Sequence, residues 1–212
     1  MGSVSVCDLK ADWYRGAAPI IFRPYDQIMS VDPAKLRIEI YPTEVLRTKA
    51  SEIAASPEVR AVAERMVNLM GGAEGIGLAA PQIGLSWRLF VAHVPAHEGD
   101  PNDPEFPCNT TQPQAFVNPV IVETSDDLEP YDEGCLSLPG ITGEVRRPSK
   151  VTMKALDLDG NEIEIKASGL LARCWQHEID HLDGVLILDK MSQTSRLKNR
   201  TRIKAMEKAK KR

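Results

Sequence analysis

The chain has 212 residues, of which 42% are hydrophobic and 26% are charged. This length and composition are typical of a globular domain with its own core, and no apolar run approaches the roughly 20 residues that a membrane span requires. The N-terminal residues include Asp8 and Asp12 and lack a basic start followed by a long apolar stretch. We therefore expect no export or transit signal, no membrane association and a cytoplasmic location.

The first part of the chain is predicted to contain an extension, a strand and a helix. Residues 1–36 show weak periodicity and are interpreted as an N-terminal extension. Residues 38–47 resemble a short strand that turns at its proline. From Pro57 the apolar residues recur at helical spacing, and Gly71 and Gly72 provide a stop.

The middle of the chain is predicted to be rich in strands. Residues 87–94 and 115–123 are typical of strands. Between them, residues 95–114 form a long loop rich in Pro and Asn, which we interpret as an insertion. Residues 150–167 alternate on both sides of an Asp-Gly pair, a pattern that predicts a β-hairpin.

A helix is predicted over residues 168–184, with Ser168 as its N-cap. Its inward stripe is expected to consist of residues at i, i+4, i+7 and i+11, namely Leu170, Cys174, His177 and His181. Strands that precede a late buried helix indicate an α+β fold, with antiparallel sheets packed around that helix and a further helix at the C-terminus.

The stretch QHEIDHLDG, at residues 176–184, suggests a metal site. His177 and His181 are four residues apart, so on a helix they lie one turn apart on the same face. Glu178 projects about 100° away, beside the open side of an ion held by the two imidazoles.

The third metal ligand is less obvious. The metzincin pattern requires a histidine where this chain has Ile187, and the only downstream glutamate is Glu207, within a basic segment. Cys135, in the upstream stretch EGCLSLPG, is the better candidate, because one thiolate and two imidazoles leave a fourth position for water. Alone, Cys135 could be a buried structural cysteine or a nucleophile, but together with the two histidines the metal interpretation is favoured.

A third distinctive stretch is GIGLAAPQIG at residues 75–84. Its glycine spacing formally matches a dinucleotide-binding fingerprint, but that fingerprint follows a strand and opens a helix, whereas this stretch follows a helix and meets Pro81 at once. We interpret it as a loop that a ligand's backbone approaches closely, with the Gln82 amide aimed at that ligand. A plain packing loop remains the alternative.

These three stretches, in this order, resemble the peptide deformylase motifs GxGLAAxQ, EGCLS and QHExDHLxG. FVNP, LDLDG and GLLAR also resemble that family, so we expect a catalytic metal-dependent domain at residues 37–190. The resemblance implies that the metal ligands are Cys135, His177 and His181. It implies that Glu178 is the catalytic carboxylate, and that the oxyanion donors are the Gln82 amide and the Leu136 backbone N–H.

The resemblance also implies the substrate and the metal. The substrate is the N-formylmethionyl end of a nascent polypeptide, as in N-terminal methionine processing during protein biosynthesis, and the products are formate and a free amine. Fe(II) is implied as the native metal, whereas ligand type alone favours Zn(II); Zn(II), Ni(II) and Co(II) are the alternative occupants.

The methionine side chain needs an apolar pocket beside the motifs. By adjacency and resemblance, the candidates are Ile76, Gly77, Tyr131, Leu170 and Cys174, although Leu170 and Cys174 could equally be plain core. The chain departs from compact family members in its extension and its insertion. It also has Thr142 where some members carry an arginine.

The C-terminal segment is strongly basic. Residues 196–212 hold nine Lys and Arg residues and one Glu, a net charge of +8, while the remainder of the chain carries −12. We expect a basic C-terminal helix over residues 191–212, either as a solvated face or as a contact for an anionic partner such as ribosomal RNA.

Two other functions are compatible with these motifs. A metalloendopeptidase would use the same water and glutamate on an internal amide. A non-catalytic, metal-stabilised ribosome-binding module would depend on the basic segment alone. Gln82 argues against the second alternative, because a closed structural metal site needs no oxyanion donor.

Overall fold

The computed structural model describes residues 31–95, 103 and 105–209, and the elements below belong to the unit Val31–Arg212. Most of the predicted extension, at residues 1–30, and the part of the predicted insertion at residues 96–102 and 104 lie outside the described residues. None of the helices among the described residues combines the length and the apolar character that a membrane span requires.

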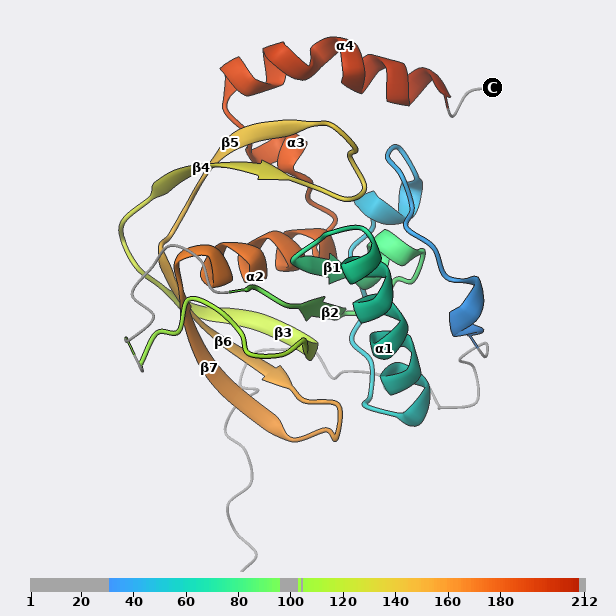
Figure 1. The fold of residues 1–212 in the computed structure, drawn as a ribbon, viewed down its shortest axis with the longest axis vertical. Helices are drawn as coiled ribbons and strands as arrows, with labels where there is room; N and C mark the ends of the chain where they lie inside the picture. The colour runs from blue at the N-terminus through green and yellow to red at the C-terminus, as the bar shows by residue number, and fades with distance from the viewer. Residues whose placement is uncertain (1–30, 96–102, 104, 210–212) are drawn as a thin grey trace, which may run out of the picture. The chain divides into compact units, whose positions relative to one another are not determined.

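A five-stranded antiparallel sheet forms the centre of the unit (Figure 1). Its order is β1-β2-β3-β6-β7, with β1 at Gly77–Ala79, β2 at Leu89–Ala92, β3 at Gln114–Thr124, β6 at Lys150–Leu156 and β7 at Glu162–Ser168. Strands β2 and β3 and the β6–β7 hairpin confirm the predicted strands. The turn of that hairpin contains Gly160 at φ +86°.

The central sheet is covered by a helix on each face. α1 (Pro57–Gly72) packs on one face and α2 (Gly169–Leu182) on the other. Successive residues of a strand point to opposite faces, so Leu89 and Val91 of β2 join the core beneath α1, whereas Phe90 joins the core beneath α2. Burial on both faces explains why β2 is an unbroken apolar run.

The predicted boundaries of α2 are confirmed, but its capping differs from expectation. Ser168 occupies the N-cap position without a side-chain cap, because its Oγ donates to the Phe106 carbonyl at 2.7 Å. After the helix, Gly184 has φ +73°, and a Cβ there would meet the Arg47 carbonyl oxygen at 2.7 Å. Both the positive φ and the close backbone therefore require glycine at this stop.

A second, two-stranded sheet lies on the other side of α2 (Figure 1). It pairs β4 (Glu129–Gly134) with β5 (Thr142–Arg147), neither of which was predicted. After the short helix α3 (Ile187–Lys190), α4 (Gln193–Ala209) packs against β5 and confirms the expected C-terminal helix. A third core, which includes Leu138, Ile141 and Val145, fills the space between these elements.

The strand predicted at residues 38–47 is wrong. The segment instead contains the 3₁₀ turn η3 at Glu44–Arg47, and a similar turn, η2, precedes it at Pro33–Lys35. The N–H of Glu39 donates to the Gln82 carbonyl and that of Tyr41 to the Ser137 carbonyl, so this stretch bonds to separate loops rather than to one neighbouring strand. A proline within a short apolar run removes one ladder donor and favours this outcome.

Candidate metal centre and active site

Three segments that are distant in the sequence meet at one cavity of about 430 Å³. They are the strand β1 with the following 3₁₀ turn η4 (Ala80–Ile83), the end of β4 with the loop after it, and one face of α2. The three motifs identified in the sequence therefore lie together. The predicted inward stripe of α2 supplies Leu170, Cys174 and His177 to the cavity wall.

Cys135, His177 and His181 form a cluster of potential metal donors. One ligand atom from each residue lies within 4.8 Å of the others, and Cys135 Sγ is 3.3 Å from His181 Nε2. The described residues contain no other group of this kind. Because zinc and similar metals bind sulfur at about 2.3 Å and imidazole at about 2.0–2.1 Å, donors at this separation can converge on one ion.

Glu133 fixes the orientation of His177. Its Oε2 lies 3.0 Å from His177 Nδ1, while both of its oxygens accept hydrogen bonds from Arg147, at 2.7 and 2.9 Å. Burial alone would raise the pKa of Glu133, but the hydrogen bonds from Arg147 and His177 outweigh it and hold this pKa far below its usual range. An ionised carboxylate only accepts, so Nδ1 carries the proton and Nε2 is left for a metal.

Glu178 Oε2 is a buried polar atom beside the cluster that lacks a partner among the described residues; His181 Nδ1, the ring nitrogen other than the one that approaches Cys135, lacks one as well. Buried polar groups are rarely left unpaired, and an unpaired one calls for a bound ion, water or ligand. The thiol and imidazole donors and the unpaired Glu178 oxygen therefore fit a divalent metal with a water beside it.

Glu178 is 3% exposed and lines the cavity. Burial raises the pKa of Glu178 to about 7, against the lowering effect of the charges on His177 and Arg147. Gly77 faces it: a Cβ at this position would collide with Glu178 Oε1 and would lie 2.8 Å from Cys174 Sγ. Only glycine leaves room for the carboxylate there, which explains the glycine of the GIGLAAPQ stretch.

Gln82 points its amide towards the cluster. Its Oε1 accepts from the Ala79 N–H at 2.8 Å, and its Nε2 lies 3.5 Å from Cys135 Sγ. The side chain is buried in the 3₁₀ turn η4, so its position is fixed. Leu136 also lines the cavity, next to Cys135.

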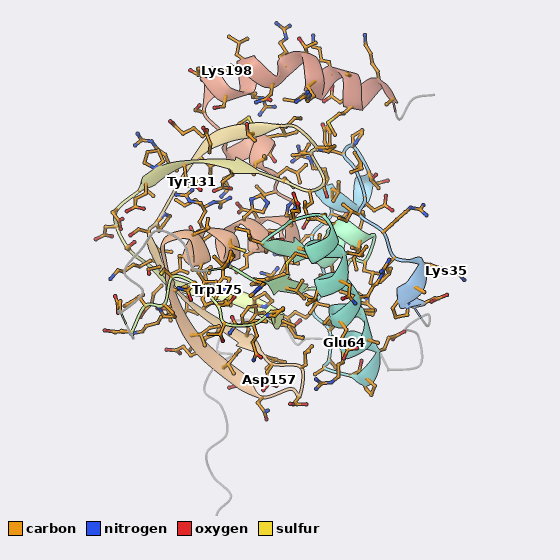
Figure 2. All side chains as sticks on the ribbon, viewed as in Figure 1. Lys35, Glu64, Tyr131, Asp157, Trp175 and Lys198 are labelled. Atoms are coloured by element: carbon orange, nitrogen blue, oxygen red, sulfur yellow. The ribbon has the colours of Figure 1, made fainter. Side chains whose placement is uncertain are left out.

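The predicted pocket residues are brought together with one exception. Ile76, Gly77, Leu170 and Cys174 line the cavity. Tyr131 is not among the lining residues; it lies on β4 (Figure 2), is 45% exposed, and its ring lies 5.2 Å from the Arg173 guanidinium carbon.

Among the lining residues that sequence reasoning missed, two are charged and buried, Glu133 and Arg173. A signal for each was present in the sequence. Glu133 begins the EGCLS motif, and Arg173 lies one helical turn before His177, beside the stripe expected to face inward. A charged residue beside an inward stripe requires a buried partner, and the pair at 2.9 Å between these two side chains meets that need.

A cysteine and two histidines beside a buried glutamate, on an α+β scaffold, define a metal-dependent hydrolase. The family model described as polypeptide deformylase matches residues 35–197. Curated peptide deformylases from Thermodesulfovibrio yellowstonii and Rhodopseudomonas palustris are 42% and 43% identical to this chain; the alignments cover 77% and 82% of it, and 93% and 94% of those proteins.

Solved structures of peptide deformylases are also similar to this chain. The peptide deformylase from Ehrlichia chaffeensis is 35% identical, with a TM-score of 0.74 over 82% of this chain and 98% of that one. A plant peptide deformylase is 38% identical, with a TM-score of 0.75 over 86% of this chain and 94% of that one. The chain belongs to the peptide deformylase family, metal-dependent hydrolases that remove the formyl group from N-formylmethionyl nascent peptides. The family and the α+β fold expected from the sequence are confirmed.

Proposed function

We propose that Glu178 carries the proton during deformylation at this site, within a catalytic domain at residues 37–190. The observation that supports this proposal is its position: a buried carboxylate with an unpaired oxygen beside the Cys135, His177 and His181 cluster.

The chemistry is divided between the metal and the protein. A divalent metal held by Cys135, His177 and His181 would supply an acidic water and a Lewis acid for the formyl oxygen. Glu178 accepts a proton as the water oxygen bonds to the formyl carbon. It returns that proton to the amine nitrogen as the carbon–nitrogen bond breaks, so formate and a free N-terminus are released.

Gln82 and Leu136 are proposed to stabilise the charge that develops on the formyl oxygen. The Gln82 Nε2 donor lies beside Cys135. The second donor to the formyl oxygen is proposed to be the backbone N–H of Leu136, the residue after Cys135. The buried Ala79 N–H holds the Gln82 carbonyl oxygen and so turns the NH₂ group towards the cavity. Losing one such donor typically raises the barrier by about 2.7–4 kcal/mol.

The substrate backbone is proposed to lie between two sheet edges. β1 is an edge strand of the large sheet and β4 pairs only with β5; the start of β1, at Gly77, and the end of β4, at Glu133 and Gly134, line the cavity. An extended peptide placed there can hydrogen-bond to exposed backbone groups. The apolar side chains of Ile76, Leu170 and Cys174 then receive the methionine side chain.

Fe(II) is the proposed native metal, and Zn(II), Ni(II) and Co(II) are the proposed alternatives. Anaerobically purified protein should contain about one iron per chain by metal analysis. If iron is native, air should inactivate the enzyme by oxidising the metal or the Cys135 thiolate, while the Ni(II) form should persist. Equal lifetimes of the iron and nickel forms in air would contradict this assignment.

Formate release from a formyl-Met peptide tests the proposed function. The same peptide without its formyl group is the control, because a metalloendopeptidase would cleave it at an internal amide whereas this enzyme should leave it intact. Cleavage of the unformylated peptide, or the absence of any turnover by metal-loaded protein, would contradict the proposal.

We also propose that the enzyme works in the cytoplasm and contacts the ribosome through α4. Lys198, Arg200, Lys204 and Lys208 are exposed and form no ion pair within the described part of the chain. The helix is held by its other side, where Ile203 and Met206 join the third core. This leaves a cationic face towards solvent, as a contact with RNA phosphates requires.

A further inference from the structure

The wall of the substrate cavity contains a cation that is neither a proposed metal ligand nor a proposed proton carrier. Arg173 lies on α2 and is only 7% exposed, yet it lines the cavity together with Leu170, Cys174 and His177. Leu170 lies three positions before Arg173, and Cys174 and His177 lie one and four positions after it. All four side chains therefore lie on one side of α2. Arg173 therefore borders the apolar space proposed for the methionine side chain.

The Arg173 guanidinium is held in a fixed position. Nη1 donates to Glu133 Oε1 at 2.9 Å and to the Val145 carbonyl at 3.1 Å, and Nη2 donates to the Glu129 carbonyl at 2.7 Å. The Tyr131 ring lies 5.2 Å from its central carbon. A group held by β4, by β5 and by an aromatic ring cannot swing out to make room for a ligand.

Two donors of this guanidinium are free of protein partners. Arginine carries five N–H groups, and three are engaged by Glu133, Val145 and Glu129. The Nε–H and the second N–H of Nη2 donate to no acceptor among the described residues, and Nε is not among the fully buried unpaired atoms. Arg173 lines the cavity, and these two N–H groups are its donors without a partner among the described residues.

We propose that Arg173 gives the methionine pocket a polar end wall that recognises a hydrogen-bond acceptor at the tip of the side chain. This proposal rests on the proposed function. Ile76, Leu170 and Cys174 surround the methylene groups, and the guanidinium meets the atoms beyond them. A thioether sulfur is a weak acceptor, a sulfoxide oxygen is a strong one and a hydrocarbon chain has none. The pocket should therefore also process N-formylmethionine sulfoxide, the oxidised form of the start residue.

The test compares three formyl peptides that differ only in the first side chain: methionine, methionine sulfoxide and norleucine. For each, kcat/KM is measured with the wild-type enzyme, with Arg173→Met and with Arg173→Lys, all with their metal content determined. The deciding quantity is the ratio of kcat/KM for the sulfoxide peptide to that for the norleucine peptide. Losses of metal or of folded protein cancel in this ratio, because both substrates meet the same enzyme.

Arg173→Met should lower this ratio by about tenfold or more, the effect of one hydrogen bond to a charged donor. Arg173→Lys keeps the positive charge and N–H donors but loses the fixed planar geometry of the guanidinium, so its ratio should fall between those of the wild type and Arg173→Met. Leu170→Ala is the matched control: it enlarges the apolar part of the same pocket and should change rates for all three peptides without lowering the ratio. Calorimetry on the deformylated product peptides should give the same order of enzymes: the preference in affinity for the sulfoxide peptide over the norleucine peptide should be largest for the wild type, smaller for Arg173→Lys and smallest for Arg173→Met.

An unchanged ratio in Arg173→Met, or an equal fall in Leu170→Ala, would overturn the role of Arg173. The proposed function would survive that result provided the wild-type enzyme still releases formate from the methionine peptide. Failure of the wild-type enzyme on every formyl peptide would instead contradict the proposed function itself.

Discussion

Gly77 is the residue at which the active site leaves least room for a side chain. A Cβ there would collide with Glu178 Oε1 and approach Cys174 Sγ to 2.8 Å, and both neighbours are buried. Neither can retreat freely, because Glu178 is enclosed by the helix and the cavity wall. The glycine therefore sets the position of the carboxylate.

Gly77→Ala should lower kcat/KM by about 10²-fold, since a displacement of about 1 Å at a reacting group costs that much. Metal content should stay at the wild-type level, because Gly77 touches none of the three donors. Gly71→Ala is the matched control, as a Cβ there meets nothing within 4 Å. A Gly77→Ala enzyme with wild-type kcat/KM would show that the carboxylate position is not critical.

Glu178→Ala should lower deformylation by at least about 10²-fold while the fold and the bound metal persist. The carboxylate is proposed to carry the proton, and its removal leaves the Cys135, His177 and His181 donors untouched. Formate release and metal analysis on the same sample measure both effects, and Glu178→Gln serves as the variant of unchanged shape. Near-normal turnover by metal-loaded Glu178→Ala would end the proton-carrier assignment.

At the residue scale, site residues that lie in a contiguous motif are easier to predict from the sequence than residues that come together only in the folded structure. Cys135, His177 and His181 were assigned together because their motifs are contiguous and chemically distinctive. Arg173 was missed because its partners Glu129, Glu133 and Val145 lie about 28–44 positions away. Tyr131 was expected in the pocket; it is not among the residues that line the cavity, but its ring contacts Arg173, which is.

At the scale of elements, β4 and β5 show why the second sheet was not predicted. The sequence of β4, EPYDEG, contains residues that are depleted in strands, and nearly all of it is exposed. β5 does alternate between exposed and buried positions, but its buried residues are Gly143, Val145 and Arg147. A glycine and an arginine on the inner face hide the apolar alternation that identifies a strand.

Arg147 joins β5 to both neighbouring elements. It donates to Glu133 on β4 and, through Nη1, to Asp180 on α2 at 2.7 Å, and Asp180 also pairs with Lys190 at 3.2 Å. Arg147 and Glu133 are buried and Asp180 is largely buried, whereas Lys190 is exposed. Removing one member of such a network leaves its partners unpaired, which is more costly than losing an exposed ion pair.

Arg147→Met should therefore reduce the free energy of unfolding of the metal-free protein by about 3–5 kcal/mol at neutral pH. Because the folded-state pKa of Glu133 is lowered, its stabilising contribution is present above the unfolded value near 4.5 and is lost as pH falls through the folded value. In the variant Glu133 takes up a proton at a higher pH than in the wild type. The cost of the substitution should therefore shrink under acidic conditions.

Denaturant unfolding at several pH values, with a chelator present, measures this cost. Arg60→Met is the matched control, since its pair with Asp159 is largely exposed and should contribute at most about 1 kcal/mol at any pH. A loss in Arg147→Met as small as that of Arg60→Met would show that the network does not join these elements.

At the scale of the whole molecule, the charge is divided between α4 and the rest of the chain. The segment 196–212 carries +8 and the remainder −12, so a polyanionic partner attracts one part and repels the other. The inner side of α4 contacts the loop that borders the cavity and the start of β5: Arg202 donates to the Gly140 carbonyl, and Asn199 donates to that of Thr142. Deleting the helix would disturb this loop as well as remove the charge.

Substitution of outward lysines on α4 separates these two effects. The triple variant Lys198→Gln, Lys204→Gln and Lys208→Gln keeps the inner contacts of the helix and removes three positive charges. A matched variant, Lys35→Gln, Arg37→Gln and Lys49→Gln, removes the same charge from exposed positions outside α4; Lys198 and Lys35 mark the two regions in Figure 2.

If α4 contacts ribosomal RNA, the α4 variant should bind ribosomes more weakly and with a shallower dependence on salt, because fewer counterions are released when fewer phosphates are neutralised. The matched variant should bind as the wild type does, and all three proteins should hydrolyse a short formyl-Met peptide at similar rates, since none of the altered residues lines the cavity. Co-sedimentation with ribosomes at several salt concentrations measures affinity and slope together. Equal losses in both variants would indicate a general charge effect, and unchanged binding in the α4 variant would mean that its cations only keep the helix solvated.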